Sequence, residues 1–223
     1  MYSISESFMG INPNIKGKVR ISVGEGLGVE ILTKYLNKFY KKYPEIEIEL
    51  LADTRSRSLS NRETDILISL SRPKKGRLKS WKLCDYYVKL YGSNEYLKNN
   101  PKISDIKELT NHKFVNYADE LIEFPELNYL QEINSNPNIV FSSNSLRSQL
   151  LAVKNGIGIG LLHSFVAYKE KDLKVILPKK INIKREYWIV VHENSFHLRR
   201  IKAVTDFVTT ILNDEKKFLS TVK

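Results

Sequence analysis

The chain has 223 residues, and its 42% hydrophobic and 10% aromatic content is enough to build a real core, which excludes a disordered protein. No window approaches the ~20 uninterrupted apolar residues of a membrane span, and the N-terminus lacks a secretion signal, so we expect a cytoplasmic protein without a membrane partner. The net charge of +11 invites nucleic-acid binding, but the basic residues are scattered, and we interpret them as solvated surface charge, with a weak phosphate-binding patch as the alternative.

The first predicted elements are a strand, a glycine turn and a helix. Apolar residues alternate over 19–23, and the turn Gly24-Glu25-Gly26-Leu27-Gly28 follows. An apolar stripe over 32–43 then predicts a helix. The turn has neither the GxGxxG nor the GK[ST] spacing, and Glu25 would repel phosphates, so we expect neither a dinucleotide site nor a P-loop.

Two further strands follow, and the order predicts a parallel sheet. Pro44 ends the helix. In 46–50 isoleucine and leucine alternate with glutamate, which indicates a strand with one solvent-exposed face, at a sheet edge or an interface. A third strand is predicted over 65–70. A long strand rich in tyrosine is predicted over 83–91. Three strand-to-helix steps in a row favour an α/β fold.

A second lobe is expected to begin near residue 93. The elements predicted after it are a helix over 103–109, a strand over 113–117 and a short helix around 127–131 within a loop of residues 118–138. A strand over 186–192 and a last helix over 198–212 end the predicted elements, and this helix belongs to the first lobe.

The segment 141–167, FSSNSLRSQLLAVKNGIGIGLLHSFVA, predicts a parallel crossover unit. The polar cluster Ser142 to Ser145 suits a helix start, Gly156 suits its end, and an apolar run over 157–162 reads as a buried strand. Ligands of such sheets lie beyond the carboxyl ends of the strands, and a helix start favours an anion. The alternative is that the serines only cap the helix.

No residue pattern indicates catalysis or a metal. Cys84 is the single cysteine, and the four histidines include no pair at the i, i+4 spacing of a helical zinc site. The serine cluster lacks a GxSxG turn, no nucleophile is paired with a base, and the many carboxylates are unplaced. We therefore expect no catalytic residues, no metal, no cofactor and no enzyme.

Five segments, in the same order, resemble the effector-binding domain of LysR-type transcriptional regulators. They are GKVRISVGEGLGVEILTKYLNKFYKKYPEIEIEL, LSNRETDILISLSRP, KLCDYYVKLYGSNEYLKNNP, QLLAVKNGIGIGLLHSF and YWIVVHENSFHLRRIKAVTDFV, between about 17 and 212. The resemblance implies a type 2 periplasmic-binding-protein fold, with two Rossmann-like α/β lobes joined by two crossover strands and a small-molecule effector between them. It also implies a homodimer formed through sheet edges and flanking helices, which suits the wet strand 46–50 and the helix 32–43.

The expected organisation follows from this resemblance. Residues 1–16 are a linker remnant, 17–92 plus 190–213 form lobe I, 93–189 form lobe II, and 214–223 form a C-terminal tail. In that family a winged helix-turn-helix and a linker helix precede this domain. Because only the linker remnant stands in front of it, we expect DNA contact only through a helix-turn-helix absent from this chain. A truncated gene, an excised domain and a free-standing sensor remain the alternatives.

The resemblance places an effector cleft on residues of both lobes. These are Glu25, Gly26, Asp53, Thr54, Ser71 and Arg72 from the first lobe, and Tyr117, Asp119, Ser143, Asn144 and Ser145 from the second. Arg72 is the main candidate for binding a carboxylate; the alternative is a salt bridge with Glu25 or Asp53, which would favour a neutral or cationic effector. His163 stands where relatives usually carry proline, as a core residue or as a cleft residue that senses effector charge or pH.

The predicted function is therefore a ligand-sensing and dimerisation module of a transcription regulator, in which effector binding rearranges lobes and subunits. The alternatives are a soluble solute-binding receptor and an enzyme on the same two-lobed scaffold. The sequence does not identify the effector.

Overall fold

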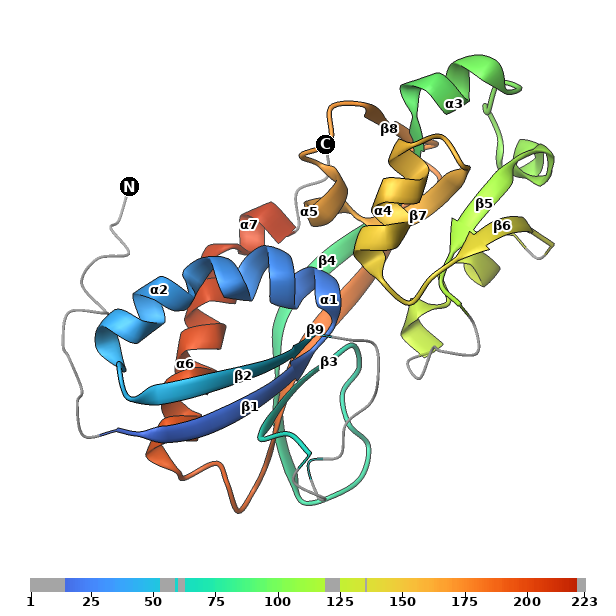
Figure 1. Cartoon of the computed structure of the whole chain (residues 1–223). Helices are drawn as coiled ribbons and strands as arrows, with labels where there is room; N and C mark the ends of the chain where they lie inside the picture. The colour runs from blue at the N-terminus through green and yellow to red at the C-terminus, as the bar shows by residue number, and fades with distance from the viewer. Residues whose placement is uncertain (1–14, 53–58, 60–62, 119–124, 135, 220–223) are drawn as a thin grey trace. The chain divides into compact units, whose positions relative to one another are not determined.

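The computed structural model describes residues 15–52, 59, 63–118, 125–134 and 136–219. They divide into two compact units (Figure 1). Unit 1 holds the described residues within 1–52, 57–83 and 188–214, and unit 2 holds those within 84–187 and 215–223. Each unit combines a sheet with helices, so the predicted α/β class is confirmed.

Unit 1 is built on a sheet in the order β2-β1-β3-β9. Its elements are β1 (Gly17–Val23), α1 (Glu25–Leu27), η1 (Gly28–Leu32), α2 (Thr33–Lys42), β2 (Ile46–Ala52), β3 (Ile66–Ser69), the first part of β4 (Leu78–Ser93), the last part of β9 (Ile183–His192) and α6 (Arg199–Asp214). β1 pairs in parallel with β2 and β3, which confirms the parallel sheet, and β9 pairs antiparallel with β3.

The core of unit 1 follows the alternation seen in the sequence. Val19, Ile21 and Val23 of β1 are at most 2% exposed, as period-two side chains on the covered face of a strand should be. The ring of Phe39 on α2 lies 4.8 Å from that of Phe207 on α6, so the two helices pack together beside the sheet (Figure 1). β2 is the edge strand of this sheet, as the alternation of apolar and acidic residues over 46–50 predicts.

The glycine turn expected at residues 24–28 is wrong. Helix begins at Glu25 and continues through η1 into α2, with only Gly24 extended before it. A Cβ on Gly28 would lie 2.9 Å from Val23 Cγ1 and 3.3 Å from the Ala52 Cβ. This glycine therefore lets the helix approach the ends of β1 and β2 closely, and the sequence pattern alone does not distinguish that role from a flexible turn.

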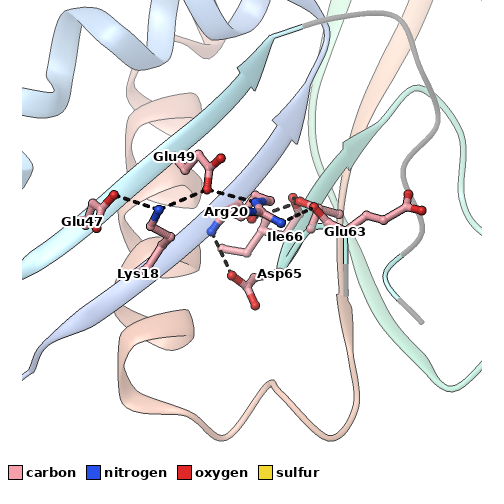
Figure 2. A network of polar contacts seen from close by, with 8 residues as sticks. Lys18, Arg20, Glu47, Glu49, Glu63, Asp65 and Ile66 are labelled. Carbon is pink, nitrogen blue, oxygen red and sulfur yellow. Dashed lines mark hydrogen bonds and ion pairs between the residues drawn. The ribbon is translucent and has the colours of Figure 1, made fainter. Parts of the chain in front are cut away.

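Charged side chains join β1 to the edge strand β2 (Figure 2). Lys18 Nζ lies 3.0 Å from a Glu47 carboxylate oxygen and 3.5 Å from one of Glu49, and Arg20 Nε donates to Glu49 at 3.0 Å. The Arg20 backbone N–H donates to Asp65 at 2.8 Å. The hydrogen bond from Arg20 lowers the pKa of Glu49. These pairs favour the observed register of β1 and β2, although solvent screens such exposed contacts.

Unit 2 is built on a sheet in the order β4-β7-β5-β6, with β8 also paired to β4. Its further elements are α3 (Asn94–Asn99), η2 (Ile106–Asn111), β5 (Lys113–Asn116), η4 (Pro125–Leu127), η5 (Leu130–Glu132), β6 (Asn138–Ser142), α4 (Leu146–Lys154), β7 (Ile159–His163), α5 (Ser164–Ala167), β8 (Leu173–Ile176) and α7 (Lys216–Leu219). Both β6 and β7 run parallel to β5, so the predicted crossover unit is confirmed. The helix predicted at 103–109 is a shorter 3-10 helix, η2.

Two strands pass from one unit into the other. β4 begins in unit 1 and ends in unit 2, and β9 runs the other way. These are the two crossover strands of the predicted type 2 periplasmic-binding-protein fold. In the part of the chain that the structure describes, no helix is long and apolar enough to cross a bilayer.

Candidate functional site

The first set of predicted site residues lies at the carboxyl ends of neighbouring strands in unit 1. Glu25 is the first residue of α1, directly after β1, and Gly26 behind it is buried. Ser71 and Arg72 follow β3, which pairs with β1, and the Ser71 N–H donates to Ser69 Oγ at 3.3 Å. Parallel pairing thus brings both ends to one edge of the sheet. Asp53 and Thr54 lie outside the described residues.

Arg72 is exposed, and its guanidinium carbon lies 5.8 Å from the centre of the Trp188 ring. The two residues come from adjacent strands, because Ser69 of β3 is paired with Trp188 of β9. Among the described residues Arg72 forms no ion pair, so the alternative of a salt bridge now depends on Asp53. When one face of a guanidinium lies over an indole ring, the N–H groups at its edge can still donate hydrogen bonds to an anionic ligand.

The second set lies at the carboxyl ends of neighbouring strands in unit 2. Asn116 at the end of β5 is paired with Ser142 at the end of β6, and the Ser143 N–H donates to the Asn116 carbonyl at 3.1 Å. The Ser143 hydroxyl in turn accepts the Ser145 N–H at 3.1 Å. This turn leaves the Asn144 side chain exposed.

The serine cluster caps α4 as predicted. The Ser145 hydroxyl accepts the Ser148 N–H at 3.2 Å, which satisfies one of the N–H groups that a helix start leaves without a helical partner. Gln149, only 1% exposed, braces the turn by donating its amide to the Ser143 carbonyl at 2.7 Å. The cap and the strand ends are therefore held as one rigid piece.

The two helix starts differ in charge. α1 carries Glu25 in its first turn, whereas α4 has no acidic residue in its first turn. The positive end of a helix dipole attracts an anion, and in α1 the protein's own carboxylate already supplies one. The start of α1, whose first turn already carries a carboxylate, is therefore less suited to an anionic ligand group than the start of α4.

Tyr117 and His163 are both largely buried in unit 2. Tyr117 follows β5 and is 4% exposed, and His163 ends β7 and is 5% exposed. His163 Nε2 lies 3.2 Å from the Tyr129 hydroxyl, and burial lowers the pKa of His163 to about 3. The imidazole is therefore neutral at physiological pH, which favours the core alternative over a pH sensor. Asp119 lies outside the described residues.

Tyr129 joins a buried polar chain that the sequence does not reveal. Its hydroxyl lies 3.1 Å from that of Tyr86 as well as close to His163, and the Arg185 guanidinium lies 5.3 Å from its ring centre. The ring of Tyr117 is 6.2 Å from that of Tyr129. Tyr129 falls in the segment predicted to be mostly loop, and its burial depends on contacts from distant parts of the chain.

The described residues contain no group of three or more histidines, cysteines or acids that could hold a metal ion. Cys84 is buried in β4. What the strand ends offer is a guanidinium, hydroxyl and amide groups, and a helix start, which are groups that bind and orient a polar ligand.

Comparison with known proteins gives one family match and several relatives. The family described as LysR substrate binding domain matches residues 14–212. The glycine cleavage system transcriptional activator homolog of Haemophilus influenzae is 24% identical over 203 residues, with 89% of this chain and 66% of the relative covered. The uncharacterized HTH-type transcriptional regulator YkuM of Bacillus subtilis is 24% identical over 226 residues, with 96% and 74% covered. The chain thus spans roughly two thirds to three quarters of the length of these relatives.

Solved structures share the fold. The regulatory domain of CrgA, a LysR-type regulator from Neisseria meningitidis, has a TM-score of 0.74 at 20% identity, over 88% of this chain and 99% of that one. The regulatory domain of CcmR from Synechocystis, solved in complex with 2-PG, has a TM-score of 0.74 at 16% identity, over 89% and 99%. Since the family match extends over residues 14–212, the chain belongs to the LysR substrate-binding-domain family, the ligand-binding regulatory module of LysR-type transcription regulators.

Proposed function

We propose that this chain senses a small carboxylate-bearing effector through Arg72 in unit 1 and the Ser143 to Ser145 turn in unit 2. The observation that supports this most is that each unit gathers its polar candidates at the carboxyl ends of paired parallel strands. The planar guanidinium fits a carboxylate with two hydrogen bonds, and the start of α4 favours a negative charge.

The charge of Glu25 restricts the ligand further. A carboxylate in the first turn of α1 disfavours a second negative group on that side. We therefore expect an effector with one carboxylate and an uncharged or cationic remainder. Should Asp53 pair with Arg72, the site would instead select a neutral or cationic compound.

Signalling requires that the effector prefer one arrangement of the protein. A ligand held by both units favours the conformation of the chain in which both units can contact it. This preference shifts the conformational equilibrium, and the shift in turn changes how the subunits of a dimer are arranged. DNA contact belongs to a helix-turn-helix outside this chain, and the site of action is the cytoplasm. The two curated relatives are named as transcription regulators, which supports regulation rather than catalysis.

A ligand panel tests the proposal. A compound present at about 100 times its Kd stabilises the chain by about 2.7 kcal/mol, which corresponds to a rise in melting temperature of about 5–10 °C for a chain of this size. In a Trp81→Phe background, the remaining Trp188 beneath Arg72 should report the same binding by fluorescence.

The matched variants are Arg72→Ala and Lys74→Ala, two exposed cations of the same loop. Loss of a charge-assisted hydrogen bond at Arg72 should weaken binding about 10–100-fold, whereas Lys74→Ala should leave it unchanged. Equal affinities of the two variants, or a response only to cationic compounds, would contradict a carboxylate site at Arg72.

We also propose a homodimer formed through the β2 edge and the helix that crosses beside it. Val29 of η1 is 52% exposed and Tyr40 of α2 is 37% exposed, which leaves apolar surface near an edge strand. Light scattering should give a dimer for the wild type and a monomer for Val29→Glu with Tyr40→Glu. Exposed Tyr168→Glu in unit 2 serves as the control, and a monomeric wild type at micromolar concentration would refute this interface.

A further inference from the structure

Unit 2 contains a pocket of about 380 Å³ whose lining includes none of the predicted effector residues, although Ser164, the residue after His163, is part of it. Its walls come from β4, α5, β8 and α7, with aromatic side chains Phe165, Tyr168 and Phe218 among them. We propose that this pocket is a second small-molecule site, which takes an uncharged compound of one or two aromatic rings bearing a hydroxyl or ring N–H group.

The size and the lining set the class of ligand. Pockets that bind small molecules have volumes of about 300–1,000 Å³, so this one lies at the small end. Tyr168 is 61% exposed, and its ring meets that of Phe218 edge-on at 4.7 Å. A flat aromatic ligand can continue this packing, because edge-to-face and offset ring pairs are favourable beyond the area that they bury.

A polar group in the pocket wall favours a ligand that carries a hydroxyl or N–H group. Ser164 is 4% exposed, and its hydroxyl oxygen has no hydrogen-bond partner among the described residues. Buried hydroxyl groups nearly always have a partner, because an unpaired one keeps the cost of its lost hydration. A rotation about the Ser164 Cα–Cβ bond that turns this covered hydroxyl toward the pocket would let a ligand hydroxyl or N–H become its partner, which selects a polar aromatic compound over a purely apolar one.

The carboxylate of Glu170, which lines the pocket, disfavours an anionic ligand there. Glu170 lines the pocket, and its carboxylate is 2.6 Å from Lys154 Nζ. The pair is already neutral as a whole, and its hydrogen bond raises the pKa of Lys154, so the ammonium stays with Glu170. A ligand carboxylate placed beside Glu170 would find repulsion without a free cation. This preference is opposite to the one proposed for Arg72, so the two sites are distinguishable by ligand charge.

The test is a calorimetric titration of the full chain with three probes. 4-Methylphenol should bind saturably with one molecule per chain. 1,4-Dimethylbenzene, in which a methyl group replaces the hydroxyl and no hydrogen bond is possible, should bind about tenfold more weakly. 4-Hydroxybenzoate, which adds a negative charge, should bind more weakly still.

Two variants connect the probes with the pocket. Val175→Trp, a half-buried position of the β8 wall, should fill the pocket and abolish binding of 4-methylphenol. Ser164→Ala should weaken binding of 4-methylphenol about tenfold while leaving binding of 1,4-dimethylbenzene unchanged, which a general effect on packing would not do. Should Val175→Trp fail to fold, the Ser164→Ala comparison decides the question.

Arg72→Ala is the control in the other unit, and it should leave the affinity for 4-methylphenol unchanged. The proposal fails if 4-methylphenol shows no saturable binding, if Ser164→Ala weakens both probes equally, or if Arg72→Ala abolishes binding. Carboxylate binding that disappears in Arg72→Ala bears only on the Arg72 site, so each proposal can fail alone.

Discussion

Tyr129 is the shared member of a buried hydrogen-bond chain that also contains Tyr86 and His163. All three side chains are at most 5% exposed, and burial raises the pKa of both tyrosines well above the usual value, so their hydroxyls stay protonated. The hydrogen-bonded chain is therefore neutral and links the two hydroxyls to His163 Nε2, while His163 Nδ1 has no partner among the described residues.

Removal of the Tyr129 hydroxyl should destabilise the protein. In Tyr129→Phe, Tyr86 and His163 both lose a buried hydrogen-bond partner, and we expect the free energy of unfolding to fall by about 1–3 kcal/mol. Urea denaturation measures this change. Tyr168→Phe, at a position 61% exposed, should change stability by less than about 0.5 kcal/mol. Equal midpoints for the two variants would show that the hydrogen-bond chain has no energetic role.

His163 makes stability depend on pH. Its pKa is lowered to about 3 by burial, from an unfolded value of 6.5, so between these values the unfolded chain binds the proton and the folded protein does not. Stability is therefore complete above pH 6.5 and is lost as the pH falls towards 3, by about 1.5 kcal/mol between pH 6.5 and pH 5.

His163→Gln should remove this part of the pH dependence while retaining an amide near Tyr129. The pKa of His112 is also lowered by burial, but His112 remains in both proteins and cancels in the comparison. Urea denaturation at the two pH values supplies the measurement. A variant with the same slope as the wild type would indicate that His163 is protonated in the folded protein.

At the scale of elements, Gly158 sets how closely two strands approach, and Gly24 has no such role. A Cβ on Gly158, just before β7, would lie 2.6 Å from the Lys113 carbonyl oxygen of β5. Gly24 before α1 has nothing within 4 Å of such an atom, and its φ of −60° suits any residue. The two positions therefore form a matched pair.

Gly158→Ala should cost about 3 kcal/mol of unfolding free energy, because a strand backbone rather than a flexible side chain must move. Gly24→Ala should cost less than about 1 kcal/mol, mostly through a weaker helix start. Chemical denaturation of both variants measures the difference. If Gly158→Ala were as stable as Gly24→Ala, the close pairing of β5 and β7 would be incorrect.

The comparison of these elements with the sequence shows what a pattern can predict. Alternation over 19–23 and the cap at Ser145 are local signals, and the structure confirms the strand and the helix that they predict. The role of Gly28 depends on the ends of β1 and β2, and that of Tyr129 on β4 and β7, so neither has a local signature. The candidate site shows the same division: the position of Arg72 and Ser143 after strands could be predicted from the sequence, whereas the approach of Arg72 to the Trp188 ring could not.

At the scale of the whole molecule, the function proposed above requires that one ligand be held by residues of both units. The family match over residues 14–212 supports a ligand-binding module, and β4 and β9 are the segments through which the units are joined. A ligand that binds at Arg72 alone would stabilise unit 1 without affecting unit 2, and it could not act as a signal by bringing them together.

The most direct test is the distance between spin labels on the two units, measured by pulsed electron paramagnetic resonance. The labels are placed at exposed positions with Lys75→Cys and Arg147→Cys, in a Cys84→Ser background that removes the native thiol. A carboxylate that stabilises the wild type should shorten and narrow the distance distribution, and Arg72→Ala should abolish that change. A distribution that stays the same while the ligand is demonstrably bound would contradict joint binding by the two units.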